Sequence, residues 1–257
     1  MAINLLVVDA LNLIRRVYAA QPGEDRPERA SSSLTASVQS LERALRECRP
    51  SHAACVFEGQ GRSWRHQLYA DYKAGHSPMP EALRQQLPAF KEEFDKHGVS
   101  SFDLPTLEAD DVIATLATKV GLRGGGTVIL STDKVFLQLL SANVRVRDHF
   151  GRRELDRAFV VNKFGVPPEQ LVDLLALAGD STNNIPGVPG IGPKTAAKLV
   201  TEFGTLEKIL SAAPTIAGKV GERLRAHAEE ARLSWSLVRL RVDLELGLNL
   251  RSLRYGG

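Results

Sequence analysis

Acidic residues stand at the ends of three apolar segments of the sequence. They are Asp9 at the end of residues 3–9, Glu58 at the end of residues 53–58, and Asp133 at the end of residues 127–133. Such β-branched, apolar runs are typical of strands buried in a parallel sheet, and the ligand crevice of that sheet lies outside the carboxyl ends of its strands. Carboxylates that share a site stay ionised at neutral pH only if a cation compensates them. The pattern therefore predicts a cation site.

A helix expected over residues 107–120 would bring further acids to the same edge. Its first turn contains Glu108, Asp110 and Asp111. Each acid alone has a simpler explanation, because acids at a helix N-terminus interact favourably with the macrodipole and a strand-end Asp can cap a turn. As a set, oxygen ligands without His or Cys favour Mg²⁺, or Mn²⁺ in its place, over zinc. We expect magnesium.

A phosphatase of the dehalogenase type is a rival for such a site. Its nucleophilic aspartate also ends the first strand, but that class has a second aspartate two residues later. Here Asp9 is followed by Ala10 and Leu11. The sequence disfavours this alternative.

Residues 62–80 (RSWRHQLYADYKAGHSPMP) alternate basic side chains with Trp64, Tyr69 and Tyr72. Basic groups bind phosphates and aromatic rings stack on unpaired bases, so the composition suits contact with single-stranded nucleic acid. The alternative is that the aromatic rings belong to the core and the charges to the surface. Because the stretch follows Glu58, we expect it to form a loop over the metal crevice.

The most specific local pattern is residues 185–199 (IPGVPGIGPKTAAKL). It is not a Walker loop, because the glycine spacing differs and no strand precedes it. Its glycines permit a tight hairpin, and Pro193 suits the first turn of a following helix. A helix-hairpin-helix that grips duplex backbone is predicted, with a purely structural connector as the alternative. The expected DNA contacts are Gly187, Gly190, Ile191, Gly192, Lys194 and Lys198.

Strands and helices alternate over the first part of the chain. We expect a loop over 21–33, a crossover helix over 34–48, a weak strand over 98–104, a short strand over 144–148 and mainly helix from residue 169 onward. This order predicts a doubly wound α/β sheet followed by a helical region.

The composition is that of a globular protein of 257 residues, 43% hydrophobic and 25% charged. No stretch approaches the apolar length that a membrane-spanning helix needs, and two cysteines, Cys48 and Cys55, suggest neither a disulfide framework nor a zinc site. We therefore expect a cytoplasmic protein. Residues 187–257 hold 11 basic and 7 acidic residues, a balance of +4, against −1 for the preceding part. This asymmetry weakly favours a polyanion contact near the C-terminus.

The motifs together resemble the 5′ nuclease family, which includes flap endonucleases and the 5′-exonuclease domains of bacterial DNA polymerases. The stand-alone, exonuclease-IX-like (Xni) members are the most similar. The likeness is carried by Asp9, Glu108-Ala109-Asp110-Asp111, Ser131-Thr132-Asp133-Lys134, Gly179-Asp180 and residues 185–194.

The resemblance implies a PIN-like α/β nuclease domain over 1–165 with an arch near 62–90. A helical DNA-binding region over 166–257 would contain the helix-hairpin-helix, residues 185–204. It also implies a monomer that cleaves branched DNA, bound by its duplex and its single-stranded 5′ flap, with Lys73 and Arg65 at the scissile region. Asp9, Glu58, Glu108, Asp110 and Asp111 would hold one metal ion, and Asp133 and Asp180 a second. Potassium would bind main-chain carbonyls of Leu177, Ala178, Pro186, Val188 and Ile191.

Four positions depart from the family pattern. Val135 and Asn183 stand where carboxylates are usual, Glu58 replaces the common Asp, and His76 stands where an Arg is expected. Lost carboxylates weaken cation binding, and two-metal hydrolysis needs both ions. The sequence therefore predicts a nuclease with a weakened second metal site, or alternatively a structure-specific DNA-binding protein whose nuclease has decayed.

Overall fold

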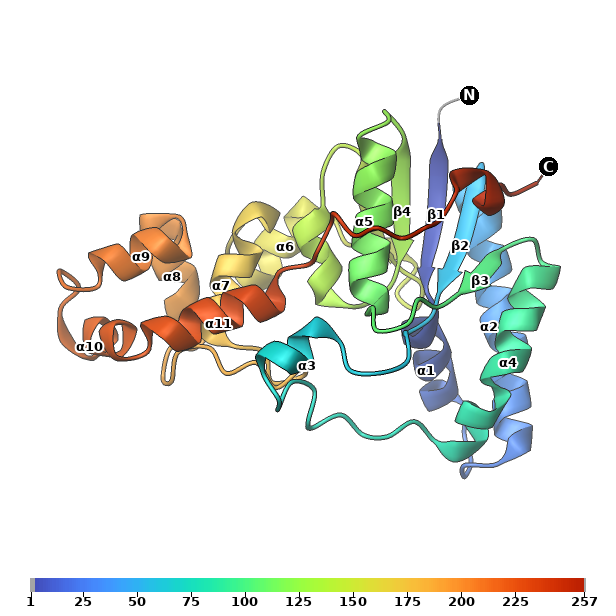
Figure 1. Cartoon of the computed structure of the whole chain (residues 1–257), viewed down its shortest axis with the longest axis horizontal. Helices are drawn as coiled ribbons and strands as arrows, with labels where there is room; N and C mark the ends of the chain where they lie inside the picture. Colours follow the sequence, from blue (N-terminus) through green and yellow to red (C-terminus); the bar gives the residue numbers. More distant parts are fainter. Residues whose placement is uncertain (1–2, 257) are drawn as a thin grey trace. The chain divides into compact units, whose positions relative to one another are not determined.

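The computed structural model describes residues 3–256 and contains one six-stranded sheet in the order β3-β2-β1-β4-β5-β6 (Figure 1). Its strands are β1 (Asn4–Asp9), β2 (His52–Val56), β3 (Ser100–Phe102), β4 (Gly126–Leu130), β5 (Val144–Asp148) and β6 (Arg153–Glu154). All neighbours pair in parallel except β5 and β6. This is the strand order of a doubly wound α/β sheet. Strands β1 to β3 are added toward one edge of the sheet and β4 to β6 toward the other, so the switch point lies between β1 and β4. The expected fold class is confirmed.

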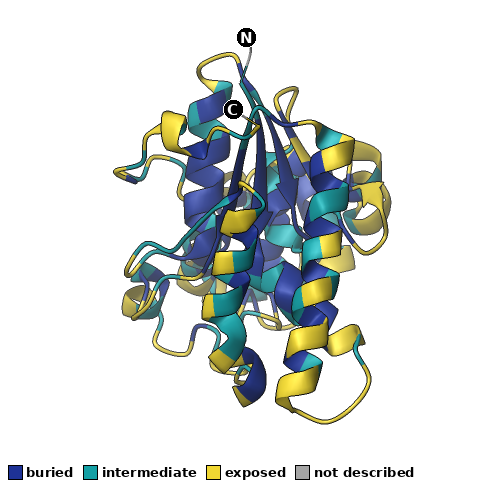
Figure 2. Ribbon diagram, turned by 90° about the vertical axis from the view of Figure 1, so that its right-hand side faces the viewer, coloured by how far each residue is buried: buried dark blue, intermediate teal, exposed yellow. Residues whose placement is uncertain are grey.

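The central strands are apolar on both sides because both faces of the sheet are covered. Leu6 and Val8 of β1 join one cluster with helices α1 (Ala10–Ala20), α2 (Pro27–Cys48) and α4 (Glu81–Lys96), while α5 (Ala109–Gly121) packs on β1 and β4 outside that cluster. Figure 2 shows buried strands between helices that are exposed on their outer sides.

Two helices differ from the sequence prediction. The prediction of a loop over 21–33 is wrong beyond residue 26, because α2 begins at Pro27. Proline is favoured in the first turn of a helix, and Ala30 and Ser33 of this helix are buried. Helix α4 was not expected at all. It buries Leu83, Phe90 and Phe94 and tolerates Pro88 in its interior.

The chain forms two compact units that are not continuous in sequence. Unit 1 comprises residues 1–63, 78–154 and 241–257, and unit 2 comprises residues 64–77 and 155–240. The last segment of unit 1 pairs with β2, where Tyr255 N donates to Ser51 O at 3.0 Å. The domain boundary expected at 165/166 was placed from the sequence motifs. The compact units of the structure instead change at residues 63/64, 77/78, 154/155 and 240/241.

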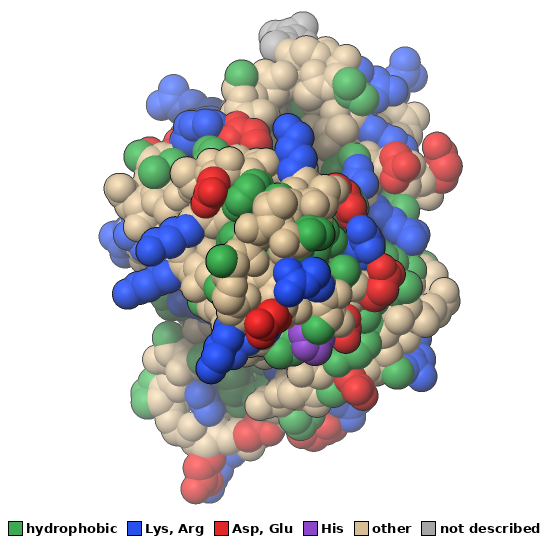
Figure 3. Space-filling model, turned by 90° about the vertical axis from the view of Figure 1, so that its left-hand side faces the viewer, with side chains coloured by type: hydrophobic (Ala, Val, Ile, Leu, Met, Phe, Trp, Pro, Cys, Tyr) green, Lys and Arg blue, Asp and Glu red, His purple; other side chains and the backbone are tan. Residues whose placement is uncertain are grey.

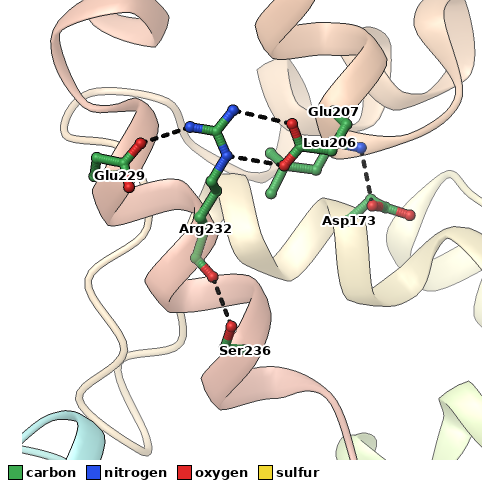
Figure 4. A network of polar contacts seen from close by, with 6 residues as sticks. All are labelled: Asp173, Leu206, Glu207, Glu229, Arg232 and Ser236. Carbon is green, nitrogen blue, oxygen red and sulfur yellow. Dashed lines mark hydrogen bonds and ion pairs between the residues drawn. The ribbon is translucent and has the colours of Figure 1, made fainter.

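Unit 2 is helical, as expected. Its helices are α3 (Trp64–Leu68), α6 (Arg157–Phe164), α7 (Leu171–Ala178), α8 (Pro193–Phe203), α9 (Leu206–Ala212), α10 (Gly218–Ala226) and α11 (Ala228–Val238). Arg232 of α11 forms a two-pronged ion pair with Glu207 of α9 at 2.9 and 3.0 Å, and Asp173 of α7 accepts a hydrogen bond from Leu206 N at 2.9 Å (Figure 4). These contacts tie α9 to both neighbours. Among residues 3–256, no helix is long and apolar enough to span a bilayer.

Candidate metal centre and nucleic-acid interface

Asp9 lies at the switch point of the sheet, where β1 ends and α1 begins. Its Oδ1 accepts a hydrogen bond from Asn12 N at 3.2 Å, which caps α1. Its Oδ2 accepts from Ser131 Oγ at 2.9 Å, across the sheet from the end of β4. The residue is only 7% exposed. A carboxylate is thus fixed in orientation at the edge where doubly wound sheets bind ligands.

The surroundings of Asp9 disfavour its negative charge. Burial raises the pKa of Asp9 to about 7, with Asp133 and Glu58 adding repulsion and the hydrogen bonds from Asn12 and Ser131 partly opposing the shift. A cation would relieve both the burial cost and the repulsion. Carboxylate oxygens are the donors that a hard divalent cation prefers, so the chemistry of these side chains fits such an ion.

Asn12 and Ser131 hold Asp9 and Asp133 in a common framework. Asn12 Oδ1 accepts from both the amide and the hydroxyl of Thr132 at 3.0 Å, and Ser131 Oγ accepts from Asp133 N at 3.0 Å. Sequence reasoning missed these two positioning residues. Two features of the sequence could have indicated them. Asn12 follows Asp9 by three residues, the spacing at which a capping side chain bonds a backbone amide, and two hydroxyl residues, Ser131 and Thr132, precede Asp133.

The start of α5 brings the second group of acids to the same unit. Glu58 Oε2 accepts from Ala109 N at 3.2 Å, so the exposed Glu58 reaches the N-terminus of α5. Glu108 and Asp111 are buried and Asp110 is half-buried. Asp111 Oδ1 accepts from Arg241 N at 3.0 Å, which anchors the returning C-terminal segment.

The acids line the edge without forming a closed ligand cage. Over residues 3–256, no three His, Cys, Asp or Glu side chains are grouped closely enough to hold a metal ion as they stand. Six of the seven expected ligands belong to unit 1, and Asp180 belongs to unit 2.

Asp180 organises a tight loop in unit 2. It exchanges two backbone hydrogen bonds with Ile185, both 2.9 Å. Its side chain is buried and accepts from Thr182 N at 3.1 Å and from Asn183 Nδ2 at 3.0 Å. Asn183 is one of the departures from the family pattern, and its side-chain amide donates to the Asp180 carboxylate. A carboxylate at position 183 would instead repel Asp180.

Lys73 is held beside the loop that follows Asp180. Lys73 N donates to Asn183 O at 2.9 Å, and Asn184 Nδ2 donates to Asp71 O at 2.7 Å. His76 Nε2 lies 2.8 Å from Thr182 O. These bonds make residues 71–76 and 182–184 one local structure, so the position of Lys73 depends on that loop.

Arg65 has a different environment from the one expected. It is only 2% exposed, and its guanidinium donates to Leu237 O at 2.8 Å and Arg239 O at 3.0 Å at the end of α11 while stacking on Trp64. A guanidinium bonded inside the protein stabilises the fold. We therefore correct the expectation that Arg65 contacts the scissile region. Tyr72 is buried too, as the core alternative predicted for the aromatic residues.

The glycine-proline segment forms a hairpin between α7 and α8. Val188 N donates to Leu177 O at 2.8 Å, and Gly187 N donates to Ser234 Oγ of α11 at 3.0 Å. Gly187 has a φ of +65°, and a Cβ there would lie 2.3 Å from Gly179 N, so only glycine fits. Lys194 and Lys198 are exposed on α8. The face drawn in Figure 3 mixes Lys and Arg with Asp and Glu side chains, so it is not a continuous basic surface.

The comparisons with known proteins cover the whole described chain. Residues 4–165 match the family described as 5′-3′ exonuclease, N-terminal resolvase-like domain, and residues 166–257 match the 5′-3′ exonuclease, C-terminal SAM fold. The chain is 43% identical to flap endonuclease Xni of Cronobacter sakazakii over 100% of both chains, and 45% identical to that of Pectobacterium carotovorum over 99% and 95%.

A solved structure shares the fold. The D15 flap endonuclease of bacteriophage T5, in a pseudo-enzyme-product complex with DNA and metal ions, superimposes with a TM-score of 0.76. It is 27% identical to this chain, with 93% of this chain and 89% of that chain covered.

Proposed function

The chain belongs to the 5′-3′ exonuclease family, and on this basis we propose that it hydrolyses branched DNA at 5′ flaps with magnesium as its metal. A metal-dependent, structure-specific 5′ nuclease is the function that the family and its relatives share. The observation that carries the proposal in this chain is the buried Asp9 carboxylate at the switch point, braced by Asn12 and Ser131 and surrounded by other acids.

The first metal ion would be held by carboxylates at the edge of the sheet. Asp9, Glu58, Glu108, Asp110 and Asp111 are assigned to one ion, and Asp133 and Asp180 to a second. When bound, divalent ions stabilise the charge that develops on the phosphodiester and lower the pKa of water. Asn12 and Ser131 orient the Asp9 oxygens, and the reaction is a direct hydrolysis without a covalent enzyme intermediate.

Lys73 is proposed to contact the phosphate at the scissile bond. Its side chain is half-buried against Tyr72, with Nζ 5.2 Å from the ring centre, and its backbone is bonded to Asn183. A lysine is a point charge that suits phosphate, and a fixed backbone limits the entropy lost when it binds.

The hairpin is proposed to grip the duplex part of the substrate. The backbone amides of Gly190 and Gly192 and the exposed Lys194 and Lys198 would face phosphates, which carry no sequence information. Gly187 and Ile191 would shape the hairpin, because their amides already donate to Ser234 Oγ and Val188 O. Potassium bound to the carbonyls of Leu177, Ala178, Pro186, Val188 and Ile191 would brace the turn. Leu177 O and Val188 O already accept backbone amides, and a carbonyl oxygen keeps a second lone pair for an ion.

A cleavage assay with matched substrates tests the proposed function. A labelled duplex carrying a 5′ flap should be cut near the branch in Mg²⁺, while the same duplex with a 3′ flap should be cut far more slowly. Cleavage that ignores the position or polarity of the flap would contradict structure-specific 5′ activity. Binding of both substrates without any turnover would favour the alternative of a decayed nuclease. That alternative is supported in this chain by Asn183, whose amide donates to Asp180 where the family usually has a carboxylate.

A further inference from the structure

A cavity of about 250 Å³ opens on unit 1 beside α1, α2 and the turn that joins β5 to β6. Its wall combines apolar side chains (Val17, Ala36 and Phe150) with polar ones (Arg43, His149 and Arg152). None of these residues is among the expected metal ligands. The volume lies just below that of pockets for drug-sized ligands, so it suits one small molecule rather than a duplex or a peptide.

Two guanidinium groups line this cavity, and a third lies over its Phe150 ring. The first two are those of Arg43 and Arg152, and the third is that of Arg16, 5.3 Å from the ring centre. Within residues 3–256, none of the three forms an ion pair with a carboxylate. Arg43 donates a 3.2 Å hydrogen bond to Ser40 Oγ, a neutral acceptor. Clustered cations without acidic partners favour an anionic ligand.

His149 adds two unused polar atoms to the same wall. It is 5% exposed, and neither ring nitrogen has a hydrogen-bond partner among the described residues. Burial lowers the pKa of His149 to about 4; Asp148 opposes the shift, and Arg16 and Arg43 reinforce it. The ring is therefore neutral at pH 7 and offers one donor and one acceptor. Unpaired buried polar groups are costly, so a rotation of the ring that brings either nitrogen to a bound ligand is favoured.

Phe150 supplies an aromatic surface next to these polar groups. It is 42% exposed, which is unusual for a large apolar residue, and it meets the His149 ring edge-on at 4.9 Å. An exposed ring beside arginines is suited to stacking on a nucleobase while the cations bind its phosphate.

We propose that this cavity binds a nucleoside monophosphate, with the phosphate at Arg43 and Arg152 and the base against the exposed ring of Phe150. The proposal rests on the proposed function only in choosing a DNA nucleotide as the ligand. That nucleotide would be either a free reaction product or one nucleotide of a bound strand, and both present the same chemistry.

Calorimetric titration of the full chain in EDTA tests the site without cleavage. Thymidine 5′-monophosphate should bind at least about tenfold tighter than thymidine or inorganic phosphate. Arg43→Gln and His149→Leu should each weaken that binding at least about fivefold, whereas Arg46→Gln, on the same helix but outside the cavity, should not. Melting curves confirm that each variant is folded, and Arg43→Gln on its own decides the result if His149→Leu unfolds.

The outcomes separate this proposal from the proposed function. No thymidine monophosphate binding, equal loss in Arg46→Gln, or equal affinity for phosphate and nucleotide would overturn the site, whatever the nuclease result. Nucleotide binding by a chain that cleaves no flap would retain the site and reject the nuclease. Displacement of flap DNA by the nucleotide identifies the bound strand as the source, and binding without displacement identifies the free product.

Discussion

The Asp9 carboxylate lies in an environment that works against its charge. It is buried, faces Asp133 and Glu58, and is kept in place by hydrogen bonds from Asn12 and Ser131. This arrangement is the usual compromise of a functional site, in which stability is given up for a group that binds a ligand.

Asp9→Asn should stabilise the metal-free protein, because the neutral amide removes a buried charge and its repulsion. A gain of about 1 kcal/mol corresponds to a rise in Tm of roughly 2–4 °C in a protein of this size class. Added Mg²⁺ should then raise the Tm of the wild type but not of the variant. A variant less stable than the wild type in EDTA would contradict the electrostatic account of Asp9.

Sequence reasoning located Asp9, Glu58 and Asp133 because strand ends in a parallel sheet share an edge, a rule that needs only local pattern. It did not locate Asn12, whose value depends on its bonds to Thr132, 120 residues away. It also assigned Arg65 to the substrate, since composition cannot tell a guanidinium bonded to Leu237 from one that faces solvent.

At the scale of elements, the hairpin between α7 and α8 depends on glycine geometry. Gly187→Ala places a Cβ in a left-handed backbone and against Gly179 N, so the turn must open. We expect lower stability and at least about tenfold weaker duplex binding. The control is Gly121→Ala, in α5, where the nearest atom to a new Cβ is 3.8 Å away. Unchanged duplex affinity in Gly187→Ala would remove the hairpin from the DNA interface.

A second prediction at this scale concerns how the stability contributed by the contact between α7 and α9 depends on pH. Burial raises the pKa of Asp173, with hydrogen bonds from Leu206 and Trp235 partly opposing the shift. A raised carboxyl pKa contributes stability below the unfolded value near 3.8, and that contribution is lost as pH rises through the folded pKa. Asp173→Asn keeps the acceptor for Leu206 N without the charge, so its Tm relative to the wild type should rise from pH 4 to pH 7.

Asp173→Ala provides the contrast for that measurement. It leaves Leu206 N, at the start of α9, without its acceptor, and should cost about 1–3 kcal/mol at every pH. Denaturant unfolding of the three proteins at pH 4 and pH 7 separates the charge from the hydrogen bond. A flat difference between Asp173→Asn and the wild type would show that the carboxyl titrates normally.

The element-scale predictions succeeded where hydrophobic periodicity was strong and failed where it was not. Strand β5 and helix α5 were anticipated because their apolar residues repeat with the period of their structure. Helix α4 was missed because Pro88 and a charged surface obscure its buried face, which is provided by Leu83, Phe90 and Phe94.

On the scale of the whole molecule, the chain assembles each unit from distant segments. Residues 241–257 return to unit 1, where Lys119 Nζ donates to Leu244 O at 2.7 Å and Asp111 accepts from Arg241 N. Residues 64–77 belong instead to unit 2. No local pattern reveals such exchanges, which is why the expected arch and domain boundary follow the sequence order rather than the packing.

Val135 and Asn183, the two departures that remove expected carboxylates, belong to different units, and changing both tests the second metal site. Val135→Asp with Asn183→Asp should raise the cleavage rate at low Mg²⁺, since each carboxylate adds a charged ligand for that ion. Asn183→Asp also replaces the amide that donates to Asp180, so the double variant should be less stable in EDTA. A folded double variant with no gain in Mg²⁺ affinity or rate would show that cleavage does not depend on this site.

The central claim is that the carboxylates at the edge of the sheet form the catalytic metal site of a 5′ nuclease. Its most direct test is the turnover of a labelled 5′-flap substrate by wild type, Asp110→Ala and Glu92→Ala, all purified in the same way, with and without Mg²⁺. Glu92 is an exposed acid on α4 whose surface ion pair with Lys96 contributes little, so its removal is the matched control. We predict Mg²⁺-dependent cleavage by wild type and Glu92→Ala, and at least about a 100-fold loss in Asp110→Ala with its fold intact. Wild-type cleavage by Asp110→Ala, or cleavage that persists in EDTA, would contradict the assignment.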